Sequence, residues 1–119
     1  MKTNLDFIAL HTKELPAARR YYTEVLGFET TPGPPNAAVF THAGGASLAL
    51  RESLPHEVRD HSGAGATLWF AVPDADTYHA QITAAGAQVT QPPQDGPFGR
   101  MFSVRTPDGH ALTFHQAQP

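Results

Sequence analysis

The sequence predicts an α+β fold made of two βαβββ modules, roughly residues 1–62 and 63–119. Three observations support this prediction. The order of a strand, a helix and further strands occurs twice along the 119 residues, with first strands about 60 positions apart. Glycines close both predicted helices, at Gly27 and Gly86. Along the predicted strands, apolar residues alternate with residues of mixed polarity, so that one face of each strand is apolar. This pattern is typical of half-buried strands.

The first module begins with a predicted strand over Leu5–His11. Pro16 opens a helical segment and Gly27 closes it, because proline suits the first turn of a helix and glycine its end. Apolar residues recur at helical spacing inside this segment: Ala18, Tyr22 and either Val25 or Leu26. A proline-rich loop and two short strands are then expected at Thr30–Asn36, Val39–Thr41 and Ser47–Arg51.

The second module follows the same order. A strand is predicted over Thr67–Val72, and Asp74 is a candidate N-cap with Asp76 in the first helical turn. The helix presents apolar residues up to Gly86: Tyr78, Ile82 and Ala85. The remaining segments are strands around Val89, over Met101–Arg105 and over Ala111–His115, a proline-rich loop over Gln91–Gly99, and a turn over Thr106–Gly109.

Composition bounds the function. Apolar residues make up 40% of the chain and charged residues 16%, so it can bury a core. The formal charge of -3 favours neither nucleic acid nor an anionic membrane surface as a partner. The absence of cysteine excludes disulfides, thiolate metal sites and iron–sulfur clusters. No apolar run is long enough to span a membrane, and we expect a soluble cytoplasmic protein.

One arrangement of two such modules buries most of their apolar surface. Each helix covers one face of a small sheet, and the other faces of the two sheets curl around a ligand cavity. Units with an uncovered face also favour association, so a homodimer is expected.

Two stretches resemble a known family. The first runs from Leu5–Leu10 into Ala18–Phe28, and the second joins Gly99–Arg105 to Pro107–His110. Together they resemble the vicinal oxygen chelate superfamily, which contains glyoxalases, bleomycin resistance proteins and extradiol dioxygenases. The resemblance implies paired βαβββ modules, usually in a dimer, with a ligand cavity in each curled sheet. Enzymes of that family use a divalent metal as a Lewis acid, whereas its resistance proteins bind a drug without metal.

The resemblance also implies four metal-ligand positions, two in each module. In this sequence they fall at Phe7, Ala49, Thr67 and Thr113. Phenylalanine and alanine have no donor atom, and threonine hydroxyls are poor substitutes for imidazole and carboxylate. We therefore expect no catalytic metal and no other cofactor.

Strand alternation predicts which side chains line the cavity. The candidate ligand-binding residues are Phe7, His11, Ala49, Arg51, Thr67, Trp69, Thr113 and His115. Trp69 either fills the core or offers a stacking face to a planar ligand, with Phe7 as an opposing wall. Arg51 is either a solvated charge or a partner for an anionic or carbonyl group. His11 and His115 are either exposed strand-end residues or bases.

The leading hypothesis is a metal-free binding protein that sequesters a planar aromatic molecule such as an antibiotic. The sequence shows no nucleophile elbow, no phosphate-binding glycine loop and no pair of carboxylates on one strand face. One alternative is an enzyme: a metal-independent lyase or isomerase with His11 or His115 as base and Arg51 as oxyanion partner, or a dioxygenase-type metal enzyme with ligands from other positions. Another alternative is a structural or carrier module in a biosynthetic assembly.

Overall fold

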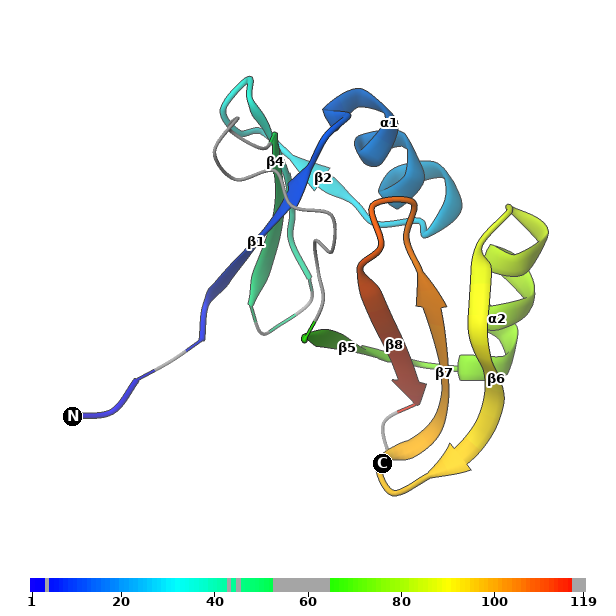
Figure 1. The fold of residues 1–119 in the computed structure, drawn as a ribbon. Helices are drawn as coiled ribbons and strands as arrows, with labels where there is room; N and C mark the ends of the chain where they lie inside the picture. Colours follow the sequence, from blue (N-terminus) through cyan, green and yellow to red (C-terminus); the bar gives the residue numbers. More distant parts are fainter. Residues whose placement is uncertain (4, 43, 45, 53–64, 117–119) are drawn as a thin grey trace. The chain divides into compact units, whose positions relative to one another are not determined.

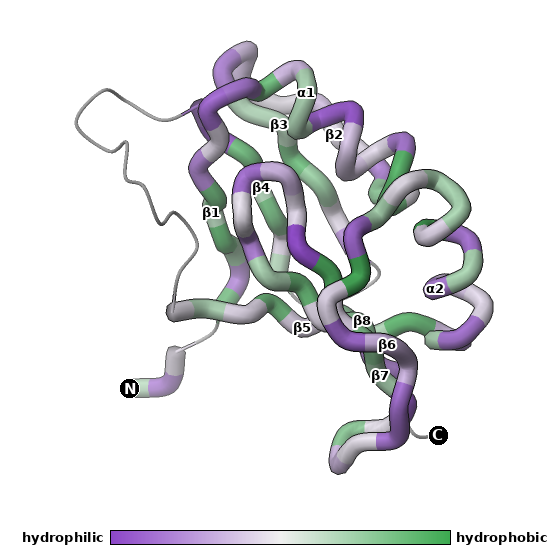
Figure 2. The backbone as a smooth tube through the Cα atoms, turned by 45° about the vertical axis from the view of Figure 1, so that its right-hand side comes forward, coloured by the Kyte–Doolittle hydropathy of each residue, from purple (hydrophilic) through white to green (hydrophobic). Residues whose placement is uncertain are grey.

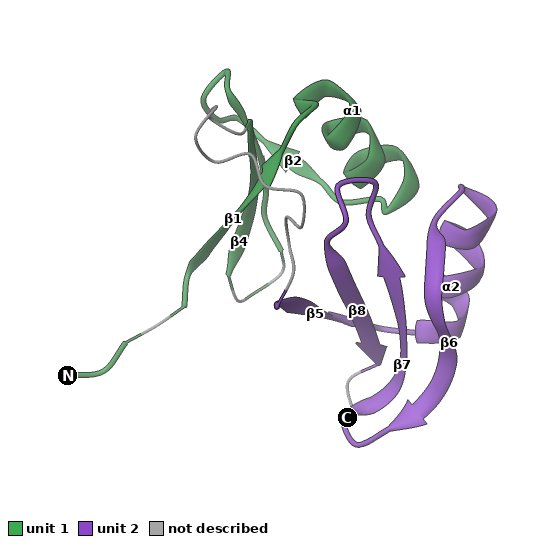
Figure 3. Ribbon diagram, in the orientation of Figure 1, with its two compact units in different colours: residues 1–60 green, residues 61–119 purple. Residues whose placement is uncertain are grey.

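The computed structural model describes residues 1–3, 5–42, 44, 46–52 and 65–116. The chain divides into two compact units, residues 1–60 and 61–119 (Figure 3). The module boundary expected near residue 62 lies outside the described residues. In the described residues, each unit contains one four-stranded mixed sheet and one helical segment (Figure 1). The predicted α+β fold of two βαβββ units is therefore confirmed.

Unit 1 has the sheet order β1-β4-β3-β2, in which β1 and β4 are parallel and the other pairs antiparallel. Its elements are β1 (Phe7–Thr12), α1 (Leu15–Arg20), η1 (Tyr21–Val25), β2 (Thr30–Thr31), β3 (Ala37–Phe40) and β4 (Ser47–Glu52). The short strand β2 lies inside the segment expected to be a loop, and β3 begins two residues before the predicted strand.

The predicted first helix changes its winding halfway. It is α-helical through Arg20 and then continues as the π-helical turn η1, where the Leu26 N–H donates to the Tyr21 carbonyl over 3.1 Å. The wider turn buries Leu26, which is 1% exposed, and leaves Val25 partly exposed. Of the two alternatives in the sequence pattern, Leu26 is therefore the core residue. Gly27 then takes a φ of 75°, which ends the helix.

Aromatic rings fill the core of unit 1. The Tyr22 ring stacks on Phe40 with centroids 5.4 Å apart and meets Phe28 edge-on at 5.7 Å. Leu48 and Leu50 of β4 are buried on the same side. This face of the sheet is therefore the one that the helix covers. Hydrophobic segments, green in Figure 2, alternate with hydrophilic residues along the chain, as expected for strands with one covered face.

Unit 2 repeats the topology with the sheet order β5-β8-β7-β6, and β5 and β8 are parallel. Its elements are β5 (Thr67–Val72), α2 (Ala75–Ala84), β6 (Gln88–Gly96), β7 (Gly99–Arg105) and β8 (Ala111–Gln116). The predicted N-cap is confirmed, since the Asp74 carboxylate accepts a 3.0 Å hydrogen bond from the Thr77 N–H. Ile82 is buried as expected, but Ala85 lies at the C-cap of α2 and is exposed.

A row of aromatic rings forms the core of unit 2. Phe70, Phe114 and Phe102 are register partners on β5, β8 and β7, and neighbouring rings stack with centroids 5.4 Å apart. The Tyr78 ring of α2 packs on Phe114 at 4.9 Å. The phenylalanines therefore mark the helix-covered face, and the residues between them in each strand occupy the opposite face.

The loop prediction for Gln91–Gly99 is wrong over most of its length. Residues through Gly96 belong to β6, and only Pro97 and Phe98 form the turn into β7. Prolines are tolerated here because β6 is an edge strand, and register shifts on both sides of Gln91 remove regular pairing where the prolines stand. The proline content therefore indicated an irregular edge strand.

The turn before β8 is as predicted. The Thr106 hydroxyl accepts a 3.0 Å hydrogen bond from the His110 N–H, and the Gly109 N–H donates to the Thr106 carbonyl over 2.8 Å. Thr106 is 3% exposed, so its hydroxyl satisfies a buried donor. None of the helices in the described part of the chain is long and apolar enough to cross a membrane.

Candidate functional site

The face of the unit 2 sheet that α2 does not cover carries both polar and aromatic side chains. Register places Trp69 of β5 beside Thr113 of β8, and Thr113 beside Ser103 of β7. One step along the same face, Ala71, His115 and Met101 form the next row. Thr67 begins β5 on this face, is exposed, and pairs with Ala111 away from these rows. We call this surface the open face of unit 2.

Three rings gather at one end of this open face. The Trp69 ring meets the Phe98 ring edge-on, with centroids 5.8 Å apart, and the His115 ring at 5.7 Å. Trp69 is 45% exposed and Phe98 63% exposed. We call these residues the aromatic cluster. Large apolar rings are usually buried, so two exposed ones in contact mark a candidate ligand surface.

The imidazole of His115 is fixed by a backbone contact. Its Nδ1 lies 2.9 Å from the Phe98 carbonyl oxygen. A carbonyl can only accept a hydrogen bond, so Nδ1 carries the proton. In the neutral ring Nε2 is then an acceptor. The bond also ties the turn between β6 and β7 to β8, which holds the Phe98 ring next to Trp69.

A short chain of polar groups runs across the open face beside the cluster. The Ser103 hydroxyl lies 2.7 Å from the Thr113 hydroxyl and donates to Gln91 Oε1 over 3.5 Å. Thr113 is 2% exposed, although it stands on the face away from the helix. Its hydroxyl therefore needs a partner, and Ser103 supplies one.

Unit 1 has its own set of predicted site residues. Phe7, on β1, is 52% exposed, and Ala49, on β4, is 3% exposed. At the end of the same strands, Arg51 Nη2 lies 2.8 Å from His11 Nε2, and the two residues are register partners. Because guanidinium only donates, His11 Nε2 accepts and its imidazole is neutral in this pair. His11 is half-buried and paired, which differs from an exposed strand-end residue.

The residues at the four expected metal positions do not fit a metal. Phe7 and Ala49 have no ligating atom. The Thr113 hydroxyl already bonds to Ser103, and Thr67 offers one exposed hydroxyl. Within the described ranges no group of three or more histidine and acidic side chains is placed to hold a metal ion.

Three other histidines pack within their own units. The His79 ring meets Phe102 at 5.1 Å, and the His42 ring meets Phe28 at 5.1 Å. Burial lowers the pKa of His42 below its usual value. His110 is 4% exposed in the turn before β8. All three contribute to the cores or turns of their units.

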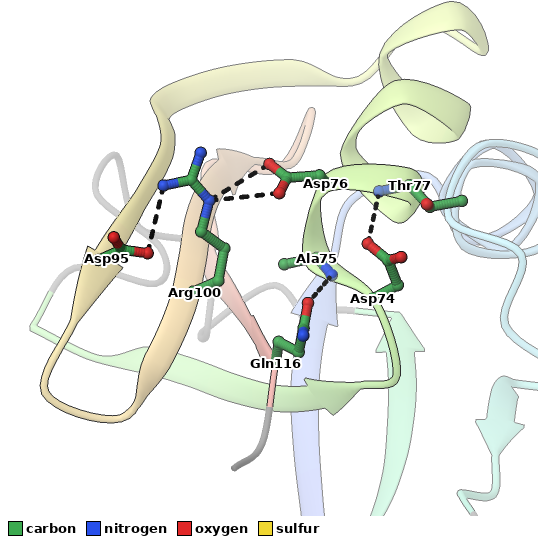
Figure 4. A network of polar contacts seen from close by, with 7 residues as sticks. All are labelled: Asp74, Ala75, Asp76, Thr77, Asp95, Arg100 and Gln116. Atoms are coloured by element: carbon green, nitrogen blue, oxygen red, sulfur yellow. Dashed lines mark hydrogen bonds and ion pairs between the residues drawn. The ribbon is translucent and has the colours of Figure 1, made fainter.

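A network of charged side chains surrounds Arg100 in the hairpin of β6 and β7, whose turn carries Phe98. Arg100, on β7, donates through Nε to both carboxylate oxygens of Asp76 at 3.3 Å and through Nη1 to Asp95 at 3.3 Å (Figure 4). Nearby, Gln116 Oε1 accepts from the Ala75 N–H over 3.0 Å (Figure 4). The first turn of α2, the hairpin and the end of β8 are therefore linked by side chains.

Part of this arrangement is not predicted by the sequence. Phe98, Ser103 and Gln91 were not among the predicted site residues. Phe98 was assigned to a loop of undefined conformation, so its contact with Trp69 could not be derived. A usable signal was present, since Phe98 stands between Pro97 and Gly99, two residue types that favour turns, and turns lie at the surface.

Comparisons with known proteins agree with the fold and the sequence motifs. Residues 4–114 match the sequence model of the Glyoxalase/Bleomycin resistance protein/Dioxygenase superfamily. The curated "Putative glyoxylase CFP32" of Mycobacterium bovis is 27% identical over 117 residues. That match covers 94% of this chain and 45% of the relative, so the chain spans about half the length of the curated relatives it matches.

Many solved structures are similar over nearly the whole chain, and two of them illustrate the likeness. TioX from Micromonospora sp. ML1 has a TM-score of 0.77 and 27% identity, covering 98% of this chain and 100% of that one. The bleomycin-binding protein of bleomycin-producing Streptomyces verticillus, solved with copper(II)-bleomycin, has a TM-score of 0.72 and 25% identity, covering 99% of each chain. By its sequence match and its paired βαβββ units, this chain belongs to the Glyoxalase/Bleomycin resistance protein/Dioxygenase superfamily.

Proposed function

We propose that this protein binds a small planar aromatic molecule without a metal, in the manner of a drug-sequestering resistance protein. The observation that carries the proposal is the exposed Trp69 ring, flanked by Phe98 and His115 on the open face of unit 2. A flat ligand that covers these rings removes apolar surface from water, and an indole face adds stacking.

The chemistry of the four expected metal positions supports binding over metal-assisted catalysis. Phe7 and Ala49 cannot ligate a cation. A metal ion that acts as a Lewis acid, as in the family's enzymes, would therefore lack ligands at these two positions. The superfamily contains a protein that binds bleomycin, which makes an antibiotic a reasonable ligand class. Unit 1 offers a separate cationic group, since Arg51, paired with His11, can contact a carbonyl or acidic substituent of a ligand bound to that unit.

The test uses the only tryptophan of the chain as its own reporter. A panel of aromatic antibiotics is screened by thermal shift, and each hit is titrated by calorimetry and by tryptophan fluorescence. A ligand that stacks on Trp69 quenches the fluorescence and raises the melting temperature. We expect Trp69→Ala to weaken that ligand by about 1–3 kcal/mol, which is roughly 5- to 150-fold in Kd.

The matched control is Leu5→Ala, which removes an exposed apolar side chain outside the open face of unit 2. It should leave the Kd unchanged. Equal Kd values for the wild type and Trp69→Ala, measured by calorimetry with both proteins folded, would remove the stacking role and with it the proposal.

A second candidate function is metal-independent lyase or isomerase catalysis. The observation that favours it is the oriented imidazole of His115, whose Nε2 is an acceptor and can act as a general base. Turnover of a bound ligand that is lost in His115→Ala but kept in Trp69→Ala would support this candidate. A ligand recovered unchanged after prolonged incubation with the wild type supports sequestration.

We also propose a homodimer as the working assembly, since each βαβββ unit has a sheet face that its own helix leaves uncovered. Light scattering coupled to size-exclusion chromatography measures the mass directly. A single species of about twice 12.8 kDa is expected. A monomer at all concentrations would show that one chain suffices for binding.

A further inference from the structure

On the open face of unit 2, the polar groups of His115, Ser103 and Thr113 can offer a ligand acceptors but no protons, and this restricts the ligands that fit beside Trp69. His115 Nδ1 donates to the Phe98 carbonyl over 2.9 Å. In the neutral imidazole only one nitrogen carries a proton, so Nε2 has a lone pair and no hydrogen to offer. The imidazole of His115, which borders Trp69, therefore offers a hydrogen-bond acceptor at Nε2.

The hydroxyls beside the cluster have no proton left for a ligand either. Gln91 Oε1 can only accept, so the Ser103 hydroxyl uses its proton in the 3.5 Å contact with that oxygen. The 2.7 Å contact between Ser103 and Thr113 then requires Thr113 to be the donor. Both hydroxyl protons are thus committed within the sheet.

We propose that this site selects planar arenes that carry a hydroxyl or N–H donor on the ring, and that His115 Nε2 is the specificity-determining acceptor. The inference rests on the proposed function, because the arene must first stack on Trp69. A phenolic O–H that reaches Nε2 forms one neutral hydrogen bond. An arene without the donor buries that lone pair unpaired, which costs free energy of similar size.

The location of His115 supports the assignment. Its ring centroid lies 5.7 Å from that of Trp69, so a bicyclic ligand on the indole can present an edge substituent to the imidazole. The hydrogen bond from Nδ1 to a backbone carbonyl restrains the imidazole, and with it the position of Nε2, before a ligand binds. A fixed acceptor discriminates better than a mobile one, since little ordering entropy is lost.

The test compares three probes that differ only at one substituent: 2-naphthol, 2-methoxynaphthalene and naphthalene. Binding is measured at about pH 8, where imidazole is generally neutral. The readout is the single indole N–H cross-peak of Trp69 in a ¹⁵N–¹H spectrum, because the chain has one tryptophan. We expect 2-naphthol to bind about 3- to 10-fold tighter than the other two probes.

Two variants separate the acceptor from the rest of the side chain. His115→Asn keeps an N–H near the position of Nδ1 for the Phe98 carbonyl but lacks Nε2, whereas His115→Phe keeps a ring beside Trp69. Both are expected to bind the three probes with equal Kd values. Melting temperatures near that of the wild type show that both variants are folded.

Three outcomes are decisive against the inference or its basis. Equal affinities for the three probes in the wild type overturn donor selection but leave stacking intact. Preference for 2-naphthol that persists in both variants shows that another group reads the donor and removes His115 from the role. Failure of every probe to move the Trp69 cross-peak overturns the proposed function itself.

Discussion

Neighbouring residues of one strand in the unit 2 sheet lie on opposite faces and play different structural roles. Phe114 is fully buried under α2, whereas its neighbour in sequence, His115, stands on the open face. Alternation along β8 is enough to separate them. The same alternation places Thr113 on the open face, yet its hydroxyl is buried and bonded to Ser103. A residue's face and its exposure are therefore separate properties.

Asp74 makes the stability of the fold depend on pH. Its carboxylate accepts the Thr77 N–H at the start of α2, and this backbone hydrogen bond holds its pKa below the usual 3.8. A carboxyl whose folded-state pKa is lowered stabilises the fold above its ordinary pKa. That contribution disappears as pH falls through the folded-state value.

The expected result is a loss of wild-type stability relative to Asp74→Asn as pH falls from about 5 to about 2. Asparagine is an equally good N-cap but does not titrate, so it isolates the charge. Urea midpoints of the two proteins measured at each pH provide the comparison. Parallel profiles over this range would show that the Asp74 carboxylate contributes nothing specific in its ionised form.

At the scale of elements, the hairpin of β6 and β7 links the fold to the candidate site. It is an irregular edge hairpin, and Phe98 stands in its turn. Besides the pairing of β7 with β8, two side-chain contacts tie it to the rest of unit 2: the Phe98 carbonyl accepts from His115, and Arg100, which also pairs with Asp95 inside the hairpin, pairs with Asp76. We expect the position of the Phe98 ring to depend on both contacts.

Arg100→Gln tests the charged contact. The ion pairs are partly exposed, so the free energy of unfolding should change by less than about 1 kcal/mol. Ligand affinity is expected to fall about 3- to 10-fold, because the hairpin must be ordered again on binding. Calorimetry and urea denaturation separate the two effects. Arg105→Gln, an exposed change on the same strand, is the control and should alter neither quantity.

The dependence of Kd on ionic strength provides a second test of the charged contact. Added salt screens the Arg100 pairs, so the difference in Kd between the wild type and Arg100→Gln should shrink above about 0.5 M salt. A difference that is unaffected by salt would assign the effect to the packing of the arginine stem instead of its charge.

At the scale of the whole molecule, the same topology occurs twice with different side chains. Ala49 lies beside Ala9 in unit 1, and Thr113 lies beside Trp69 at the equivalent place in unit 2. The two units therefore share a backbone design while presenting different chemistry. One architecture can therefore host different sites, depending on the side chains at a few positions.

The side chains at the four expected metal-ligand positions are poor metal ligands. We therefore expect that divalent metals do not change the melting temperature. Chelator-treated protein, supplied with Zn²⁺, Ni²⁺, Mn²⁺ or Fe²⁺ in turn, should melt within about 1 °C of the metal-free sample. Elemental analysis of untagged protein complements the measurement. Stoichiometric metal together with a clear rise in melting temperature would mean that ligands come from residues other than Phe7, Ala49, Thr67 and Thr113.

Much of the fold could be predicted from the sequence, because local signals were strong. Thr67–Val72 has the predicted bounds, and the Asp74 cap and the Thr106–Gly109 turn formed as expected. The errors lie where local preference competes with pairing. Pro92 and Pro93 favour a loop locally, but pairing of their flanking residues with β7 extends the strand.

The candidate site was predictable to the level of strand faces. The sequence by itself determined that Trp69 and His115 share the face away from the helix, because a period of two follows from backbone geometry. Only the tertiary structure decided that Phe98 joins them, that His115 Nδ1 carries the proton, and that Thr113 is bonded to Ser103. These facts depend on turn conformation and on distances between residues far apart in sequence, which no local pattern encodes.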